Sequence, residues 1–236
     1  METGVIVQER QPRTFTQKMK RAVAELIGRD RANRISAPFY DWVARRRTRE
    51  CLARLPKSDL QINLGCGPRS LTGWVNVDLA RGSQVDIVWD LRSGLPFGTE
   101  SCSAVFTEHL IEHLSKIDGE KLLRECHRVL QPKGVLRLST PDAGRFLRSY
   151  AGDGEFLRHP DFSEPSETLM DRINMMMREK GQHLWVYDAA SLLLALERAG
   201  FSSPVEQSFG VSLHSRMNNI DCESRKFETL YVEALK

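Results

Sequence analysis

Short apolar segments alternate with helical patterns along most of the chain after residue 60. Their length and composition predict buried strands at residues 61–64, 74–77, 86–89, 103–107 and 135–139. A helical pattern over 119–130 precedes the last strand, and Gln131–Gly134 supplies a stop and a turn between them. Strands that alternate with helices are typical of parallel sheets with crossover connections. The pattern therefore predicts an α/β fold.

The last third of the chain predicts further helices and a terminal pair of strands. Apolar residues at helical spacing predict helices over 164–180 and 188–199, and Gly200-Phe201 closes the second. Core packing is the favoured interpretation of the Met175–Met177 run, with an adaptable substrate wall as the alternative. Residues 204–209 and 227–235 alternate as half-buried antiparallel strands do.

The first 58 residues differ from the rest in charge. They hold 14 Lys and Arg against 6 Asp and Glu, whereas residues 59–236 hold 20 against 25. Amphipathic patterns over 14–28 and 38–55 predict a basic helical extension, residues 1–58, ahead of a main domain over 59–236. A packed flap with a solvated basic face is the favoured interpretation, and a surface for an anionic substrate is the alternative. Aromatic residues are not interleaved with the basic ones, which disfavours nucleic acid.

Composition places the chain among globular intracellular proteins. Apolar residues make up 41% of its 236 residues, and no apolar run approaches the roughly 18 residues of a membrane span. The five cysteines lie far apart without a Cys-x-x-Cys pair, which disfavours both a zinc ribbon and a disulfide framework. The first residues are polar rather than signal-like. We expect a cytoplasmic protein without a transmembrane segment; its oligomeric state cannot be inferred from these patterns.

Two neighbouring stretches suggest a nucleoside cofactor site. Asn63-Leu-Gly-Cys-Gly-Pro68 ends one strand in two glycines, which allow a sharp turn and close approach of a ligand. The next strand ends at Asp78, and an aspartate there can accept hydrogen bonds from a ribose diol. In such a sheet, ligands bind beyond the carboxyl ends of the strands. The predicted ends carry polar residues or glycines: Gly65, Gly67, Asp78, Asp90, Glu108, His109 and Asp142.

Taken in order, these motifs resemble class I S-adenosylmethionine-dependent methyltransferases, and most closely their small-molecule type-11 branch. The resemblance covers about residues 60–236. It rests on the motifs Asn-Leu-Gly-Cys-Gly at 63–67, Asn-Val-Asp-Leu at 76–79, Asp-Leu at 90–91, Leu-Pro-Phe at 95–97, Glu-His-Leu-Ile-Glu-His-Leu at 108–114, Leu-Arg-Glu-Cys-His-Arg-Val-Leu at 123–130 with Lys-Gly at 133–134, and Ala-Gly-Phe at 199–201. The Gly-x-Gly motif alone is weak, but the order and spacing of the set are specific.

The resemblance implies a fold, a cofactor and a reaction. The fold is a Rossmann-like, seven-stranded, mostly parallel sheet with an antiparallel last strand. The cofactor is S-adenosylmethionine, and the reaction is methyl transfer to an O, N or C acceptor, typically a small molecule, sugar or lipid-like substrate. By position, Asp78 would hold the ribose, Leu79 would face the adenine, and Asp90 would face its exocyclic amine. The full implied cofactor-binding set is Asn63, Gly65, Cys66, Gly67, Asp78, Leu79, Asp90, Leu91, Glu108 and His109.

Two departures from the family pattern change the expected site. Asn63 stands where an acidic residue is usual, so anchoring there would be neutral. Gly67 to Asp78 spans only eleven positions, whereas a parallel crossover normally needs about a dozen residues or more. Residues 68–73 can form one helical turn at most. We therefore expect another part of the chain to cover the cofactor, and the N-terminal helices are the first candidate.

Candidate catalytic residues follow from the need to deprotonate some acceptors. We expect His109, Asp142 and His183 to serve as base or pocket residues, with His113 as a further candidate. The alternatives are a hydrogen-bonded strand end for His109, a helix cap for Asp142 and a packed loop for His183. Methyl transfer does not require a metal, and we assign no metal ligands.

Two rival functions remain open. Residues 109–113 spell His-x-x-Glu-His, the inverted zinc-peptidase motif, which would need both histidines on one helix face. The same fold could also be a nucleotide-binding module without catalysis. A dinucleotide dehydrogenase is disfavoured because Ser70 stands where its third glycine belongs.

Overall fold

The structure is a computed structural model that describes residues 29–82, 84–162, 164–212 and 214–236. Side chains are described from residue 42 onward, except those of residues 83, 163, 213 and 216. The chain divides into two compact units, Met1–Arg46 and Arg47–Lys236, and the second contains the whole sheet. The helix expected over 14–28 lies outside the described residues.

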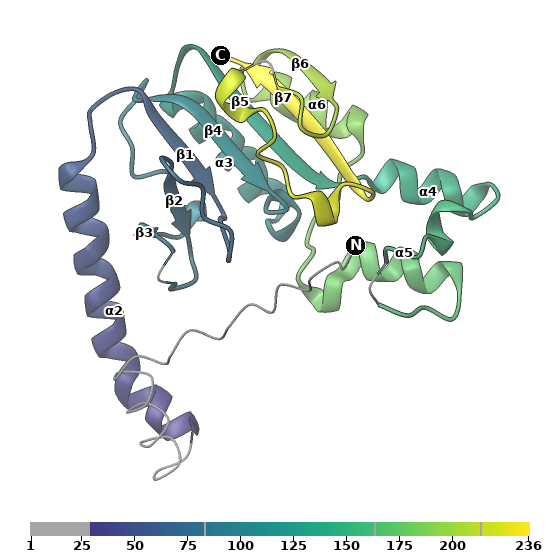
Figure 1. Ribbon diagram of the computed structural model, residues 1–236, viewed down its shortest axis with the longest axis horizontal. Helices are drawn as coiled ribbons and strands as arrows, with labels where there is room; N and C mark the ends of the chain where they lie inside the picture. The colour runs from purple at the N-terminus through teal and green to yellow at the C-terminus, as the bar shows by residue number, and fades with distance from the viewer. Residues whose placement is uncertain (1–28, 83, 163, 213) are drawn as a thin grey trace, which may run out of the picture. The chain divides into compact units, whose positions relative to one another are not determined.

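A single seven-stranded sheet organises the second unit (Figure 1). Its strand order is β3-β2-β1-β4-β5-β7-β6, and β7 alone runs antiparallel to its neighbours. This confirms the expected methyltransferase-like topology. The strands are β1 (Leu60–Leu64), β2 (Val75–Asp78), β3 (Ile87–Val88), β4 (Cys102–Glu108), β5 (Leu130–Pro141), β6 (Ser202–Gln207) and β7 (Thr229–Leu235).

Register aligns the carboxyl ends of the central strands. Leu64 of β1 pairs with Val77 of β2 and with Thr107 of β4, and Thr107 pairs with Leu138 of β5. The residues that follow these pairs therefore emerge at one edge of the sheet. That edge is where an α/β sheet binds its ligand.

The predicted turn at Gln131–Gly134 is wrong, because these residues lie inside β5. Leu130 pairs with Cys102, and the next pair is Val135 with Ala104, so the extra residues form an irregularity in the strand. Lys133 has φ +67° there, and its N–H donates to the carbonyl of Lys236 at the end of β7. The bulge keeps the strand hydrogen-bonded where a free turn was expected.

Helices flank the sheet and connect its strands. They are α2 (Arg29–Arg54), α3 (Lys116–Val129), α4 (Ala143–Ala151), α5 (Leu169–Arg178) and α6 (Ala189–Arg198). Short 3₁₀ turns add η1 (Leu91–Ser93), η2 (Ile111–His113), η3 (Phe156–Arg158), η4 (Glu179–Gly181), η5 (Ser215–Met217) and η6 (Glu223–Arg225). Helix α5 is shorter than the expected 164–180 because Thr168 and Asp171 form a capping box that starts it.

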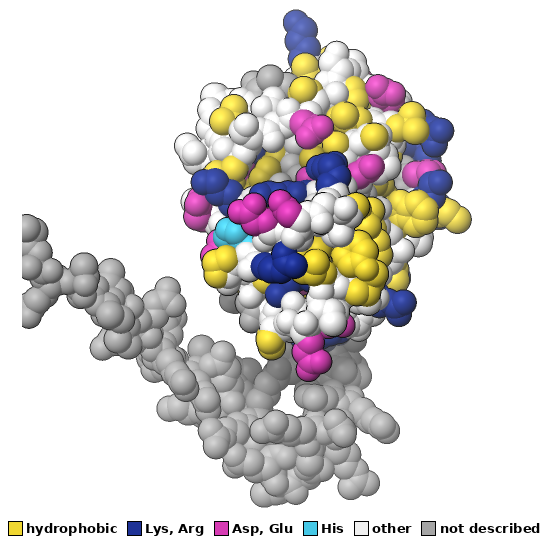
Figure 2. Space-filling view, turned by 90° about the vertical axis from the view of Figure 1, so that its right-hand side faces the viewer, with side chains coloured by type: hydrophobic (Ala, Val, Ile, Leu, Met, Phe, Trp, Pro, Cys, Tyr) yellow, Lys and Arg dark blue, Asp and Glu magenta, His cyan; other side chains and the backbone are white. Residues whose placement is uncertain are grey.

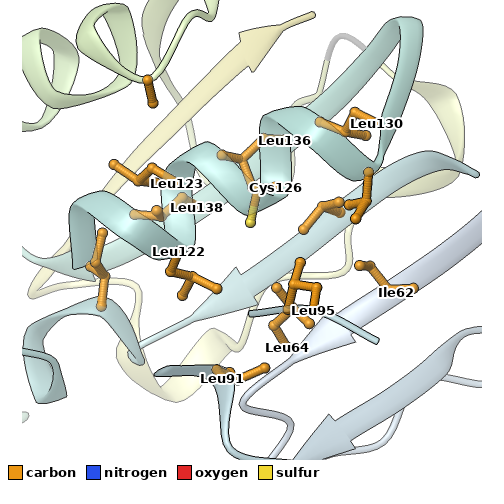
Figure 3. Packing of buried hydrophobic residues seen from close by; sticks show 14 of the residues in the cluster. Ile62, Leu64, Leu91, Leu95, Leu122, Leu123, Cys126, Leu130, Leu136 and Leu138 are labelled. Atoms are coloured by element: carbon orange, nitrogen blue, oxygen red, sulfur yellow. The ribbon is translucent and has the colours of Figure 1, made fainter. Parts of the chain in front are cut away.

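The main hydrophobic core lies between one face of the sheet and helices α3 and α6 (Figure 3). Leu122, Leu123 and Cys126 of α3 point toward Ile62 and Leu64 of β1 and their neighbours in the figure. Cys51, Leu52 and Leu55, at and just after the end of α2, pack against the same cluster. All the labelled side chains are at least nine-tenths buried, which makes this burial the principal stabilising contribution.

The opposite face is covered in a different way. Residues 68–73 contain no helix, as the short spacing predicted. Met217 and Ile220, from the connection between β6 and β7, instead pack against Ala104 and Val135. In the same connection, Asp221 forms a buried ion pair with Arg137 of β5, which also pairs with Glu233 of β7. This connection therefore replaces part of the missing helix layer.

Among the described residues, no helix is both long and apolar enough to cross a membrane.

Candidate functional site

Two glycines shape the turn after β1. Gly65 has φ +65°, and a Cβ added there would lie 2.7 Å from Cδ1 of Leu110. Gly67 has φ +51°, and a Cβ added there would meet no atom within 4 Å. L-residues adopt such backbone only at a cost of about 1–2 kcal/mol. Gly65 is therefore required by packing and by conformation, whereas Gly67 leaves open space beside a bent backbone, where a ligand can approach.

Buried amides hold this turn in place. Nδ2 of Asn63 donates to Oδ1 of Asn76 at 3.0 Å and to the carbonyl of Arg69 at 3.2 Å. Asn76 is held in turn by Asp86, whose Oδ2 accepts from its backbone N–H at 2.9 Å and from its Nδ2 at 3.1 Å. The side chain of Asn63 is buried and faces the turn. Asn63 therefore stabilises the expected cofactor turn through its hydrogen bonds. Asn76 and Asp86 stabilise the same turn, and the motif alone did not identify this role.

Asp78 closes the turn from the neighbouring strand. Its Oδ2 accepts the backbone N–H of Gly67 at 2.8 Å, and its Oδ1 accepts that of Ala80 at 2.6 Å. Each carboxylate oxygen has a second lone-pair direction, so both retain capacity for a ribose hydroxyl. Leu79 beside it is 61% exposed, which leaves an apolar surface for a planar base. The carboxylate, the bent backbone and the apolar side chain together fit a nucleoside.

Cys66, between the two glycines, is buried. Its Sγ lies 3.7 Å from the carbonyl oxygen of Gly67. Burial, with the nearby charges of Asp78 and Asp86, raises the pKa of the Cys66 thiol to about 11. The side chain therefore acts as a small neutral packing group at neutral pH.

The next expected cofactor residues, Asp90 and Leu91, have different environments. The hydrogen bonds and charge of Arg92 lower the pKa of Asp90, and Nη2 of Arg92 lies 2.7 Å from Oδ2. Leu91 is buried in the main core (Figure 3). Asp90 is thus an ionised residue near the surface, whereas the side chain of Leu91 stabilises the strand end from within.

Glu108, at the end of β4, joins the glycine turn to the β6–β7 connection. Its Oε2 accepts from Nη1 of Arg69 at 2.8 Å, and its Oε1 accepts from the backbone N–H of Cys222 at 2.8 Å. Arg69 also donates to the carbonyl of Ile220. Residues 220–222 therefore lie beside the turn that lacks its helix. Sequence reasoning missed Arg69, although an arginine in so short a loop was the available signal.

His109 is buried directly after β4, with φ +48°. Its Nε2 lies 2.8 Å from Oγ1 of Thr229, whose hydroxyl donates to the carbonyl of Arg225. Nε2 of His109 is therefore the donor to Thr229. Its Nδ1 lies 3.2 Å from Oε1 of Glu112. Both ring nitrogens are engaged, which makes His109 a partner that orients Glu112 rather than a free base.

Glu112 is a fully buried carboxylate to which sequence reasoning gave a role only in the zinc-peptidase alternative. Its Oε2 accepts from Oγ1 of Thr140 at the end of β5, at 3.1 Å. Its Oε1 lies 3.2 Å from Nδ1 of His109. Burial raises the pKa of Glu112, but the contact with His109 and the charges of His109 and His113 outweigh burial and lower it.

The geometry does not form the zinc-peptidase arrangement. Residues 111–113 form a 3₁₀ turn rather than part of an α-helix, and His109 contacts Thr229 and Glu112. His113 points elsewhere: its Nδ1 lies 3.2 Å from the carbonyl of Gln182, and its ring packs edge-on against His183 with centroids 4.9 Å apart. The two histidines of the motif therefore do not converge.

Asp142 follows β5 and caps helix α4. Its Oδ1 accepts the backbone N–H of Arg145 at 2.9 Å, as an N-cap does. His183 lies in the connection between α5 and α6, where its Nδ1 contacts the carbonyl of Met176 and its Nε2 lies 2.7 Å from Oε2 of Glu179. Of the three predicted catalytic residues, His109 and His183 join one polar cluster through Glu112 and His113, and Asp142 serves a helix end.

A family model described as "Methyltransferase domain" matches residues 14–206, which is most of the chain. Among curated proteins, malonyl-[acyl-carrier protein] O-methyltransferase 1 of Coxiella burnetii is 39% identical over 70 residues. That match covers 29% of this chain and only 24% of the Coxiella protein.

Solved structures give a similar result at low identity. A possible histamine N-methyltransferase of Thermotoga maritima is 16% identical, with a TM-score of 0.47 over 92% of this chain and 98% of that one. An S-adenosylmethionine-dependent methyltransferase of Mesorhizobium loti is 18% identical, with a TM-score of 0.45 over 79% and 96%. On the family match the chain belongs to the methyltransferase-domain family, and its strand order is that of the Rossmann-like methyltransferase fold.

Proposed function

We propose that the enzyme transfers the methyl group of S-adenosylmethionine to an O, N or C atom of a small molecule, sugar or lipid-like acceptor. One contact carries the proposal. Leu110 packs on Gly65 of the cofactor turn, and Glu112, two residues further on, reaches Thr140 at the end of β5. A buried polar cluster therefore begins directly beside the turn that would hold the methionine part of the cofactor.

The cofactor supplies an activated methyl group on a sulfonium centre. When the methyl group is transferred, the rest of the cofactor leaves as a neutral thioether. The protein must then hold the reactants in line and accept a proton where the acceptor has one. In this proposal Asp78 holds the ribose, Gly67 allows the backbone to approach, and Leu79 covers the base. His109 fixes Glu112 beside the acceptor. Glu179, whose side chain is 47% exposed, is placed to receive a released proton.

The charge distribution supports a small acceptor over nucleic acid. Figure 2 shows a face on which basic, acidic and hydrophobic side chains are interspersed, without a continuous basic surface. An open hollow of about 560 Å³ next to α4 is likewise lined by both signs of charge, including Arg145, Arg148, Asp153 and Glu155. Binding of nucleic acid depends on many phosphate contacts from Lys and Arg. The similarity to part of a malonyl-[acyl-carrier protein] O-methyltransferase makes carboxylates a class to include among acceptors.

The test is turnover on a chemically sorted panel. The full chain is incubated with S-adenosylmethionine and with carboxylic acids, phosphorylated sugars, amines or lipid-like alcohols, and formation of the demethylated cofactor is measured. We expect one class to be methylated, and we expect Asp78→Ala to form much less product at the same cofactor concentration because it binds the cofactor more weakly. Cofactor binding without turnover on any class would favour the alternative of a nucleotide-binding module.

A further inference from the structure

Two histidines and a buried glutamate converge where the connection between β4 and α3 meets the connection between α5 and α6. Each of Glu112, His113 and His183 offers one ligand atom, and these atoms lie within 4.8 Å of one another. The two segments are held together by main-chain bonds, since the N–H groups of Leu184 and Trp185 donate to the carbonyl of Glu112 at 2.8 and 3.2 Å. The cluster is therefore fixed by backbone as well as by side chains.

The hydrogen bonds of the two imidazoles present their other nitrogens as ligands. Nδ1 of His183 contacts the carbonyl of Met176, and Nδ1 of His113 contacts the carbonyl of Gln182. A carbonyl oxygen only accepts, so the proton of each ring lies on Nδ1, and the lone pair lies on Nε2 when the ring is neutral. A histidine that donates from Nδ1 to a backbone carbonyl is the usual outer support of a metal ligand.

Both Nε2 atoms face one carboxylate oxygen. Oε2 of Glu179 lies 2.7 Å from Nε2 of His183 and 3.8 Å from Nε2 of His113. A lone pair and a carboxylate oxygen repel each other at such a distance unless a cation lies between them. That cation can be a proton on one imidazole or a metal ion that joins all three groups.

Glu112 brings a buried carboxylate to this cluster. Its side chain is completely buried, with Oε2 accepting from Oγ1 of Thr140 at 3.1 Å and Oε1 lying 3.2 Å from Nδ1 of His109. A buried carboxylate needs compensating positive charge, and metal coordination is one of the ways in which proteins supply it. Its ligand atom lies within 4.8 Å of those of both imidazoles.

We propose that Glu112, His113 and His183 bind a divalent transition metal ion, with Glu179 as an exchangeable fourth ligand. Two imidazoles with carboxylate oxygen suit Zn²⁺, and also Co²⁺ or Mn²⁺. Ligand atoms of tetrahedral zinc lie roughly 3.3 Å apart, given bonds of about 2.0–2.1 Å, so the side chains close inward by rotation on binding. Glu179 is 47% exposed and can swing out, which would open a position for water or another oxygen ligand.

The proposed metal site does not depend on the proposed methyl transfer. The role that we propose for the metal ion does depend on it. Leu110, which packs on the cofactor turn, is two residues from Glu112. A metal ion held here would lie on the acceptor side of that turn. It would bind an oxygen of the acceptor, orient it and lower the cost of removing its proton.

The test is metal binding by the full chain, independent of activity. After treatment with a chelator and its removal, the protein is titrated with Zn²⁺ by calorimetry and with Co²⁺ by visible absorption. We expect one equivalent to bind, with the absorption of a Co²⁺ centre of low coordination number. His183→Asn and His113→Asn should each weaken Zn²⁺ binding by at least about 100-fold, because loss of even a supporting residue costs 10–100-fold. His159→Asn is the matched control, because His159 also lies beside a carboxylate, at 3.7 Å from Asp161, but outside the cluster.

Each outcome is decisive. Stoichiometric binding that is lost in the two cluster variants and kept in the control supports the site, provided that circular dichroism shows all variants to be folded. Failure to bind Zn²⁺ or Co²⁺, or binding that survives both cluster substitutions, overturns it. The same chelator-treated protein is titrated with the demethylated cofactor. If that ligand binds while the metals do not, the metal inference fails and the methyltransferase proposal stands.

Discussion

Replacing Asp78 separates two roles that the structure gives to one carboxylate. Asp78 accepts the backbone N–H groups of Gly67 and Ala80 and, in our proposal, the hydroxyls of the cofactor ribose. A hydrogen bond to a charged group contributes about 1.5–3 kcal/mol. Losing two ribose contacts at the lower value costs about 3 kcal/mol, so Asp78→Ala should weaken cofactor binding by roughly 150-fold.

A loss of affinity alone would not prove ribose contact, because the glycine turn also depends on Asp78. We therefore compare the demethylated cofactor with its analogue lacking one ribose hydroxyl, in wild type and in Asp78→Asn, by calorimetry. Wild type should bind the analogue roughly 10-fold more weakly, for one lost charged hydrogen bond of about 1.5 kcal/mol. Asp78→Asn should bind the two ligands with much more similar affinities. The coupling energy between the Asp78 side chain and the ribose hydroxyl is then about 1 kcal/mol or more.

Asp86→Asn is the matched control for this cycle. Asp86 supports the same loop through Asn76. Its substitution should lower affinity for both ligands by the same factor. If Asp78→Asn behaves in that way too, Asp78 acts only through the turn, and the ribose assignment is refuted.

Three further predictions concern the turn, the core and the thiols. Gly67→Ala should cost about 1–2 kcal/mol of stability from its φ of +51° and also lose cofactor affinity, whereas Gly73→Ala, with φ +82° and equally open space, should cost only stability. Arg137→Met removes the guanidinium that pairs with the buried carboxylates of Asp221 and Glu233 and should lower the free energy of unfolding in urea by about 3–5 kcal/mol. The Cys66 thiol, with a pKa of about 11, should gain reactivity toward an alkylating agent only as pH rises toward that value.

The contrary results are equally definite. Equal losses of cofactor affinity at Gly67 and Gly73 would show that backbone strain, and not ligand approach, explains the effect. An Arg137→Met protein as stable as wild type would mean that the ion pairs contribute little net stability. Rapid alkylation of Cys66 at neutral pH, followed by peptide mapping, would contradict the burial of its thiol.

The sheet could be predicted closely because its signal is local. Apolar runs identified β1 to β5, and alternation identified β6 and β7, each displaced by only a few residues at its ends. The short spacing between Gly67 and Asp78 predicted one helical turn at most, and the structure has no helix there. The prediction of a turn at 131–134 was wrong because proline and glycine are found both in turns and in strand bulges. The main-chain hydrogen bonds of Lys133 and Gly134 to Lys236, just after β7, decided between them.

The site was harder to predict because its contacts join distant segments. Arg69, Glu108 and Cys222 meet only when the β6–β7 connection folds over the sheet. The zinc-peptidase alternative does not fit because the spacing of its motif assumes a helix, whereas residues 111–113 form a 3₁₀ turn. His183, 70 positions after His113, was identified as a base candidate. Neither pattern nor spacing indicated that it would stand beside His113.

The most direct test of the whole account is a calorimetric titration of the full chain with S-adenosylmethionine and with its demethylated product. We predict saturable binding of both at one site per chain, weakened by Asp78→Ala and by Gly67→Ala. If neither ligand binds to the folded protein, the assignment of the glycine turn and Asp78 as the cofactor site is contradicted.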